Sequence, residues 1–347
     1  MVESWPAARA QALHQPVMLA QCLDLLAPAL SHPGAVLIDC TLGMGGHSEG
    51  ALERFTGLTV IGIDRDSEAI ALASERLERF GSRFHAVHAT YDEVLDVAHQ
   101  YGSSAGVDAV LMDLGVSSYQ LDMRERGFSY AHNAPLDMRM DPSVGFSAAE
   151  LLRTASHGEI ARILRVYGEE RFASSIASHI VNRRETQPVS TTGELAELVK
   201  EAIPAPARRK GGNPAKRTFQ ALRIAVNDEL GILERTLPRV ITSVRVGGHI
   251  VVEAYHSLED RLVKEVFAAG LHSSTPAGLP MELAGHEPYL EALTKGALKA
   301  SPEEIAHNPR AASVRIRAVR KIRAELFEAE CTAAHSEHSY QFKGERK

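Results

Sequence analysis

Three aspartates each end a short apolar run in the first third of the sequence. Asp39, Asp64 and Asp113 close runs that begin near residues 36, 59 and 109. Apolar runs of this length, rich in β-branched residues, are typical of strands buried on both faces of a parallel sheet. Because open α/β sheets bind ligands outside the carboxyl ends of their strands, the three carboxylates are predicted to face one pocket.

A glycine-rich turn, residues 43–48, follows the first of these aspartates. Its glycines would let the backbone approach a ligand closely before a helix begins. The turn starts like a dinucleotide fingerprint, but Ser48 stands where the third glycine is expected, and no Gly-Lys-Ser/Thr of a P-loop follows. Asp64 comes 25 residues after Asp39, about where a doubly wound fold offers a carboxylate to a ribose. The pattern favours S-adenosylmethionine, with NAD as the alternative.

Composition is that of an ordinary globular protein. The chain has 347 residues, with 44% hydrophobic and 24% charged residues, enough for two domains with sizeable cores. The first residues form no apolar signal region and no run is long enough to span a membrane, which predicts a cytoplasmic protein. The three cysteines, Cys22, Cys40 and Cys331, form no C-x-x-C pair, so we expect reduced, mostly buried thiols with neither a disulfide framework nor a thiolate zinc site, and we predict no metal ligands.

The charge distribution limits how the protein could bind nucleic acid. A net charge of −6 argues against indiscriminate coating, since non-specific affinity comes mostly from Lys and Arg. Two acid-free basic segments, 204–223 and 310–323, could still contact phosphates, although a solvated surface is the alternative for each. The candidate RNA contacts in the first segment are Arg208, Arg209, Lys216 and Arg217.

The strand pattern is interrupted after Asp113. The next strong strand signal, residues 247–255, comes more than a hundred residues later, whereas α/β connections usually need one helix. Capping-box sequences at Ser147, Ser156 and Thr191 predict helices between them. We therefore expect a helical substrate-recognition subdomain at 126–214 inserted in a core formed by 1–125 and 215–347. A long amphipathic helix over about 219–233 would return to the sheet, and residues 312–319 would form a late edge strand.

Six longer blocks of sequence are more specific than the glycine-rich turn. They are Asp113–Asp122, Arg126–Ser129, Pro135–Asp141, Tyr167–Arg171, Arg217–Ile224 and His256–Arg261. Together, in this order, they resemble the ribosomal small-subunit RNA (cytosine-N4) methyltransferase family. The resemblance runs from His14 to about Arg317, which is most of the chain.

This resemblance implies a fold, a reaction and a set of contacts. The fold is an α/β, Rossmann-like class I methyltransferase core with an inserted all-helical subdomain. The methyl donor is S-adenosylmethionine, and the acceptor is the N4 amine of a decoding-centre cytidine in 16S rRNA of the small ribosomal subunit. The implied cofactor contacts are Gly45, Gly46, His47, Asp64, Tyr91, Asp113 and Gln120, to which Asp39 is added as a partner for the methionine amino group. For His47 we expect the backbone, rather than the imidazole, to make the contact.

The reaction requires alignment of sulfur, methyl and N4 more than stabilisation of a developing anion. Because the lone pair of N4 is delocalised into the ring, an acceptor for one N–H should help free it and then assist proton loss. Our hypothesis gives this role to Asp113 with the carbonyls of residues 114–116, and the competing view makes Asp113 only a cofactor ligand. With 5% aromatic residues, the candidates to hold the base are Phe128, Tyr130 and Tyr255. Tyr255 stands where the family usually has phenylalanine.

Two other functions are compatible with parts of this pattern. A nicotinamide-dependent oxidoreductase would use the same strand edge, but the missing third glycine counts against it. A non-catalytic module could bind S-adenosylmethionine without transferring its methyl group. Calorimetry with S-adenosylhomocysteine and NAD separates the enzyme classes, and methyl transfer to unmodified small subunits separates the enzyme from the module.

Overall fold

The computed structural model describes residues 16–208, 213–276, 279 and 281–324. The chain forms two compact units, one of Met1–Gly115 with Leu230–Lys347 and the other of Val116–Glu229. The second unit begins earlier and ends later than the predicted helical subdomain, residues 126–214. It extends further at its carboxyl end because helix α12 (Lys216–Asn227) packs against α8 (His157–Gly168) of the same unit.

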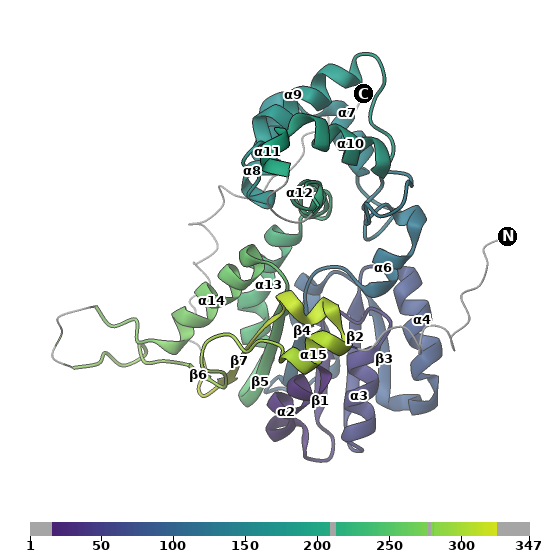
Figure 1. Ribbon diagram of the computed structural model, residues 1–347. Helices are drawn as coiled ribbons and strands as arrows, with labels where there is room; N and C mark the ends of the chain where they lie inside the picture. Colours follow the sequence, from purple (N-terminus) through teal and green to yellow (C-terminus); the bar gives the residue numbers. More distant parts are fainter. Residues whose placement is uncertain (1–15, 209–212, 277–278, 280, 325–347) are drawn as a thin grey trace, which may run out of the picture. The chain divides into compact units, whose positions relative to one another are not determined.

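A mixed sheet forms the centre of the first unit (Figure 1). Among the described residues it has seven strands in the order β3-β2-β1-β4-β5-β7-β6. The strands are β1 Val36–Asp39, β2 Thr59–Asp64, β3 Phe84–His88, β4 Val107–Asp113, β5 Val244–Ala254, β6 Leu290–Ala292 and β7 Arg315–Lys321. Strands β1 to β5 pair in parallel, and β7 runs antiparallel to both of its neighbours. The predicted α/β, Rossmann-like fold class is confirmed.

One strand prediction needs correction. Residues 312–319 were expected to form an edge strand, but β7 begins at Arg315 and lies between β5 and β6. The short strand β6 takes the edge position instead. Its three residues carry too little pattern to be recognised as a strand from the sequence.

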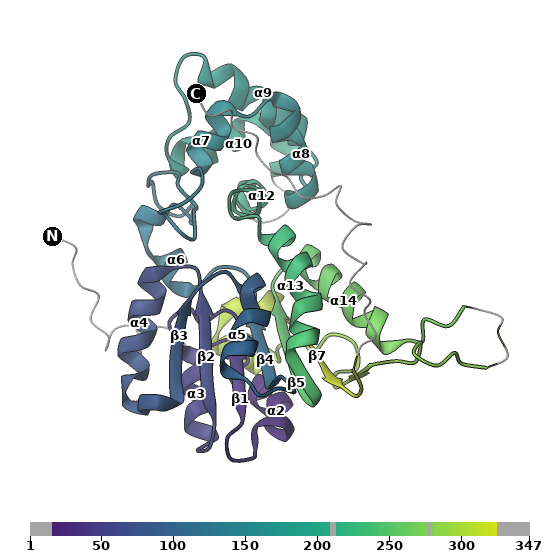
Figure 2. The same ribbon diagram turned by 180° about the vertical axis from the view of Figure 1, so that it is seen from behind.

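Helices cover both faces of the sheet, and each face has its own hydrophobic core. Helices α2 (Leu19–Leu30), α3 (Gly46–Arg54) and α4 (Ser67–Leu77) bury one face. Helices α5 (Val94–Tyr101), α13 (Glu229–Ser243) and α14 (Ser257–Leu271) bury the other, with α5 and α13 nearest the viewer in Figure 2. The short helix α15 (Pro302–His307) precedes β7. Burial on both faces explains the nearly continuous apolar runs of β1, β2 and β4.

The second unit is helical. Its helices are α6 Ser118–Asp122, α7 Ala148–Thr154, α8, α9 Ala173–Arg184, α10 Thr192–Ala202, α11 Ala205–Arg208 and α12. The predicted capping boxes at Ser147, Ser156 and Thr191 are confirmed, since each side chain accepts from the N–H three residues later and the glutamate there accepts in return. The expected single helix over 219–233 is wrong, because Asp228 adopts φ 49° and separates α12 from α13.

The thiols agree with the prediction where the structure describes them. Cys22 and Cys40 are buried and unpaired, and Cys331 lies outside the described residues. No helix in the described part of the chain combines the length and the apolar character that crossing a bilayer requires.

Candidate active site

The carboxyl edge of the sheet gathers the predicted aspartates. Strands β2, β1 and β4 are neighbours, and Asp64, Asp39 and Asp113 are their last residues. Strand β5 pairs with β4 in a register that places Glu253 beside Asp113. Four acidic side chains therefore mark the ends of four adjacent parallel strands.

Asp64 is held by the backbone of two turns. Its Oδ2 accepts from the Gly43 N–H at 2.8 Å, and its Oδ1 accepts from the Asp66 N–H at 2.9 Å. Burial raises the pKa of this carboxyl group to about 6, although the two N–H donors favour the charged form. Each oxygen keeps one further lone pair, so the carboxylate can accept two hydroxyl groups at once. That capacity fits the two hydroxyls of a ribose.

Asp39 is nearly inaccessible, at 1% exposure. Its Oδ2 accepts from the Ser48 hydroxyl at 2.7 Å, and its Oδ1 accepts from the Thr41 N–H at 3.1 Å. Burial raises its pKa, while the Ser48 hydrogen bond and the charge of His47 oppose the rise. The carboxylate thereby ties β1 to the first turn of α3.

The glycines of the turn are required by its conformation and by its neighbours. Gly45 has φ 76°, and a Cβ there would lie 3.0 Å from Leu77 Cδ1. A Cβ on Gly46 would lie 2.6 Å from Cγ of Pro16. The positive φ of Gly45 and the packing of Pro16 against Gly46 therefore favour glycine at these positions, in addition to the close ligand approach that the sequence pattern predicts.

Asp113 is fixed from several directions and stays open to solvent, with 27% of its side chain exposed. Its N–H donates to Thr41 Oγ1 at 2.6 Å, and its Oδ1 accepts from the Tyr255 hydroxyl at 2.7 Å. Burial and the charge of Glu253 raise the pKa of Asp113 to about 7, while His47 and the Tyr255 hydrogen bond act in the opposite direction. This carboxyl group changes its charge near neutral pH, as a general base does.

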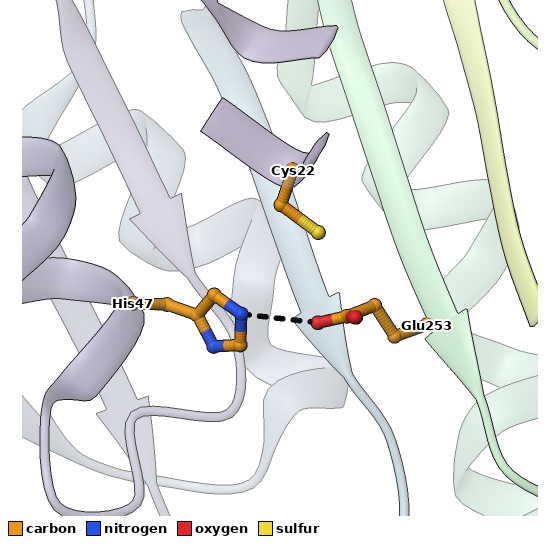
Figure 3. Close-up of side chains that lie close together, drawn as sticks. All are labelled: Cys22, His47 and Glu253. Carbon is orange, nitrogen blue, oxygen red and sulfur yellow. Dashed lines mark ion pairs between the residues drawn. The ribbon is translucent and has the colours of Figure 1, made fainter. Parts of the chain in front are cut away.

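A second group of side chains lies beneath Asp113 in the core. Figure 3 shows Cys22 of α2, His47 of α3 and Glu253 of β5 pointing toward one another. His47 Nε2 lies 3.2 Å from Glu253 Oε2, and His47 Nδ1 lies 3.6 Å from Asp113 Oδ2. The imidazole therefore lies between two carboxylates, and its exposure is 6%.

The charge of His47 follows from these neighbours. Burial lowers its pKa, but the carboxylates of Glu253, Asp113 and Asp39 outweigh burial and raise it to about 10. His47 Nε2 also lies 3.0 Å from the Val17 carbonyl oxygen, which can only accept, so this nitrogen carries a proton. The nearest donor atoms of Cys22, His47 and Glu253 lie within 4.8 Å of one another, but the protonated Nε2 of His47 has no lone pair to offer a metal ion.

The remaining predicted contacts are divided between the two units. Tyr91 begins the short 3-10 helix Tyr91–Glu93 after β3 and packs against the core of the first unit. Gln120 belongs to the second unit, where its side-chain oxygen accepts from the Ser117 N–H at 3.2 Å and its exposure is 4%. There Phe128 is buried at 7% exposure, and Tyr130 makes an edge-to-face contact with the Phe219 ring.

The candidate RNA contacts also belong to the second unit where they are described. Arg208 ends α11, and Lys216 begins α12. Arg217 donates to the Glu169 carbonyl oxygen at 3.1 Å, and this pair is exposed. Arg209 lies outside the described residues.

Sequence reasoning missed the role of Glu253. It lies within an apolar strand signal, and its exposure is 0%. A charged residue in such a run is the signal that could have identified it, since a fully buried glutamate needs a partner. Its partner His47 belongs to helix α3, about two hundred residues earlier, so only the packing of α3 against the sheet reveals the contact.

The residues at the strand edge suit a nucleoside-containing cationic cofactor. Asp64 offers acceptors for ribose hydroxyls, Asp39 and Asp113 offer negative charge, and Tyr91 offers a flat ring beside the end of β3. Asp113 can also act as a base, because the pKa of its carboxyl group is about 7. The edge can therefore bind a cofactor and remove a proton from a second substrate.

Comparison with known proteins gives the family. A model of the MraW methylase family matches residues 11–322. The chain is 60% identical to a protein of Beutenbergia cavernae named ribosomal RNA small subunit methyltransferase H, over 92% of this chain and 96% of that protein. Proteins of the same name in a Nocardioides species and in Streptomyces avermitilis are 59% and 55% identical, over 89% and 91% of this chain and 96% and 99% of theirs. The chain therefore belongs to the MraW methylase family.

Proposed function

We propose that this protein transfers a methyl group from S-adenosylmethionine to the N4 amine of a decoding-centre cytidine in 16S rRNA. The relatives' names support a ribosomal RNA of the small subunit as the substrate. The observation that carries the proposal is the carboxyl edge, where Asp39, Asp64 and Asp113 end three adjacent parallel strands beside the turn at 43–48.

The proposed cofactor contacts follow the geometry of this edge. Asp64 accepts the ribose hydroxyls with the lone pairs left by its two backbone donors. Asp39 supplies negative charge for the methionine amino group, and Tyr91 lies against the adenine. Gly45, Gly46 and His47 contribute backbone, and the side chain of His47 acts through Asp113. Gln120, which the family resemblance implies as a cofactor contact, is also proposed.

S-adenosylmethionine supplies an electrophilic methyl group on a positively charged sulfur. Asp113 accepts a hydrogen bond from one N4–H, which directs the nitrogen lone pair toward that methyl group. When N4 gains its new bond to carbon it must lose a proton, and the Asp113 carboxylate takes it. Gly115, which has φ 94°, turns the chain just after this base, so the carbonyls of residues 114–116 can orient the same amine.

The helical unit is proposed to recognise the RNA. Lys216 and Arg217 are exposed at the start of α12, Arg208 lies close before them in sequence, and Arg209 is part of the same basic segment. These side chains would bind phosphate groups of the RNA, which would explain why an acidic protein has such a basic segment. Phe128 and Tyr130 are proposed to contact the extruded base. Because the substrate is a ribosomal subunit, the proposed place of action is the cytoplasm.

Methyl transfer to unmodified small subunits tests the proposal. Subunits are incubated with the protein and isotopically labelled S-adenosylmethionine, and the nucleosides are separated and identified by mass spectrometry. Labelled N4-methylated cytidine from the decoding centre is the expected product. Label at a different nucleotide would contradict the assigned acceptor, and binding of S-adenosylhomocysteine without any methylated product would favour the non-catalytic module.

A further inference from the structure

Tyr255 makes a contact that a phenylalanine at the same position could not make. Its hydroxyl oxygen lies 2.7 Å from Asp113 Oδ1. Burial and the nearby Asp113 carboxylate raise the pKa of Tyr255 well above its usual value, so the hydroxyl keeps its proton and donates it. The sequence predicted Tyr255 as one of the residues that could hold the base. In the structure its hydroxyl group donates a hydrogen bond to Asp113 instead.

The backbone around Tyr255 fixes the direction of this hydrogen bond. The N–H groups of Tyr255 and His256 both donate to Glu259 Oε2, at 2.8 and 3.2 Å. A Cβ built on Gly115 would lie 3.8 Å from Tyr255 Cδ2, so the ring lies beside the backbone that follows Asp113. The ladder of β4 and β5 continues past the acids, since the Leu114 N–H donates to the Glu253 carbonyl at 3.0 Å. Tyr255 and Asp113 are thus held by adjacent strands in a defined register.

We propose that Tyr255 is a positioning residue, whose hydroxyl holds Oδ1 of Asp113 and so orients the carboxylate that receives the N4 proton. This inference rests on the proposed function. Among the described residues, the Tyr255 hydroxyl is the one donor that forms a hydrogen bond with the Asp113 carboxylate. His47 Nδ1 lies 3.6 Å from Asp113 Oδ2, which is too far for a hydrogen bond. The Tyr255 hydroxyl therefore restricts rotation of the Asp113 carboxylate, and so keeps it aligned with the N4 amine during methyl transfer.

The charged form of Asp113 is sensitive to all of its neighbours. Burial, Glu253 of β5 and Asp39 of β1 raise its pKa, and His47 of α3 and the Tyr255 hydroxyl lower it. Loss of the Tyr255 hydroxyl removes one of the two lowering effects. The midpoint of Asp113 ionisation should then rise by about one pH unit, as expected when a hydrogen bond to a charged group is lost.

The substitution Tyr255→Phe tests the inference because it keeps the ring and removes only the hydroxyl. Tyr101→Phe is the matched control, since Tyr101 ends α5 and its ring contacts His85. Single-turnover methylation with saturating cofactor is measured from pH 5.5 to 9 for both variants. We expect the acid limb of the Tyr255→Phe profile to move upward by about one unit, with a roughly tenfold lower rate at pH 6 and little change in cofactor affinity.

Two further measurements separate this inference from the proposed function. In the Asp113→Asn background, Tyr255→Phe should have no additional effect on the rate, and a full additional loss would show that Tyr255 acts elsewhere. Carboxyl carbon NMR of Asp113 reports its ionisation even if no substrate is methylated. An unchanged midpoint in folded Tyr255→Phe would overturn the inference, and a raised midpoint in a protein that methylates nothing would contradict only the proposed function.

Discussion

The raised pKa of Asp64 predicts that cofactor affinity falls in mildly acidic solution. Burial raises the pKa of its carboxyl group to about 6 in the cofactor-free protein. If only the carboxylate accepts both ribose hydroxyls, binding must first remove the proton whenever the pH is below that value. The contribution of Asp64 to the dissociation constant should therefore be nearly constant from pH 7 to 8 and should raise that constant by about tenfold between pH 7.5 and 5, which is about 1.4 kcal/mol.

The substitution Asp64→Asn separates the charge from the shape. Asparagine has one acceptor oxygen, whereas the native side chain uses one oxygen for Gly43 and the other for Asp66. The amide nitrogen must then face one of these N–H donors, and a hydroxyl acceptor is lost as well. We expect affinity at pH 7.5 to fall by about 1.5 to 3 kcal/mol, the range for a hydrogen bond to a charged group. The remaining affinity should no longer follow an ionisation near pH 6.

Calorimetry with S-adenosylhomocysteine at several pH values measures both effects. Asp96→Asn, an exposed position on α5, is the control for loss of one negative charge. Circular dichroism at each pH confirms that the proteins are folded. The reasoning is refuted if wild-type affinity is equal at pH 5 and 7.5, or if Asp64→Asn retains the wild-type pH dependence.

Three further predictions concern the base, the RNA and the buried charges. Asp113→Asn should reduce the single-turnover rate by a factor on the order of 10² to 10⁴ while cofactor affinity changes much less, and a normal rate at saturating cofactor would leave Asp113 as a cofactor ligand only. Neutralising Lys216 and Arg217 should weaken binding to small subunits and flatten its salt dependence by about 0.7 to 0.9 log unit per lost contact, and an unaltered slope would remove them from the interface. Because the folded pKa of His47 is about 10 and its usual value is 6.5, its stabilising effect is complete below pH 6.5 and is lost as the pH rises through 10. Urea denaturation should show Glu253→Gln to be about 3 kcal/mol less stable at pH 6, with a smaller difference at pH 10, and equal stability at pH 6 would contradict the pairing.

Local patterns predicted the sheet edge well. Apolar runs ending in Asp39, Asp64 and Asp113 determine both the strands and the end at which their carboxylates lie, because all parallel strands share one carboxyl edge. The capping box at Ser156 likewise marks the start of α8, since both reciprocal hydrogen bonds depend on residues three apart. Such features need no knowledge of distant partners.

The missed features depend on pairing between distant segments or on one backbone angle. The contacts of Asp113 with His47 and Tyr255 follow from the register of β4 and β5 and from the packing of α3, which the sequence pattern does not specify. The helix break at Asp228 has a local cause, since aspartate and asparagine adopt the left-handed conformation more readily than most residues. The apolar spacing continues across this position, so periodicity alone predicted one helix.

The whole helical unit lies within one connection of the sheet. The chain leaves the first unit after Gly115, at the end of β4, and returns at Leu230, in the helix that leads to the neighbouring strand β5. The cost of closing a flexible connection rises only slowly with its length, by about 0.6 kcal/mol for each doubling. Residues 116–229 can therefore gain, lose or exchange segments over evolutionary time while Asp113 and Glu253 keep their pairing. Segments of the helical unit can therefore change the target surface without changing the register that places Glu253 beside Asp113.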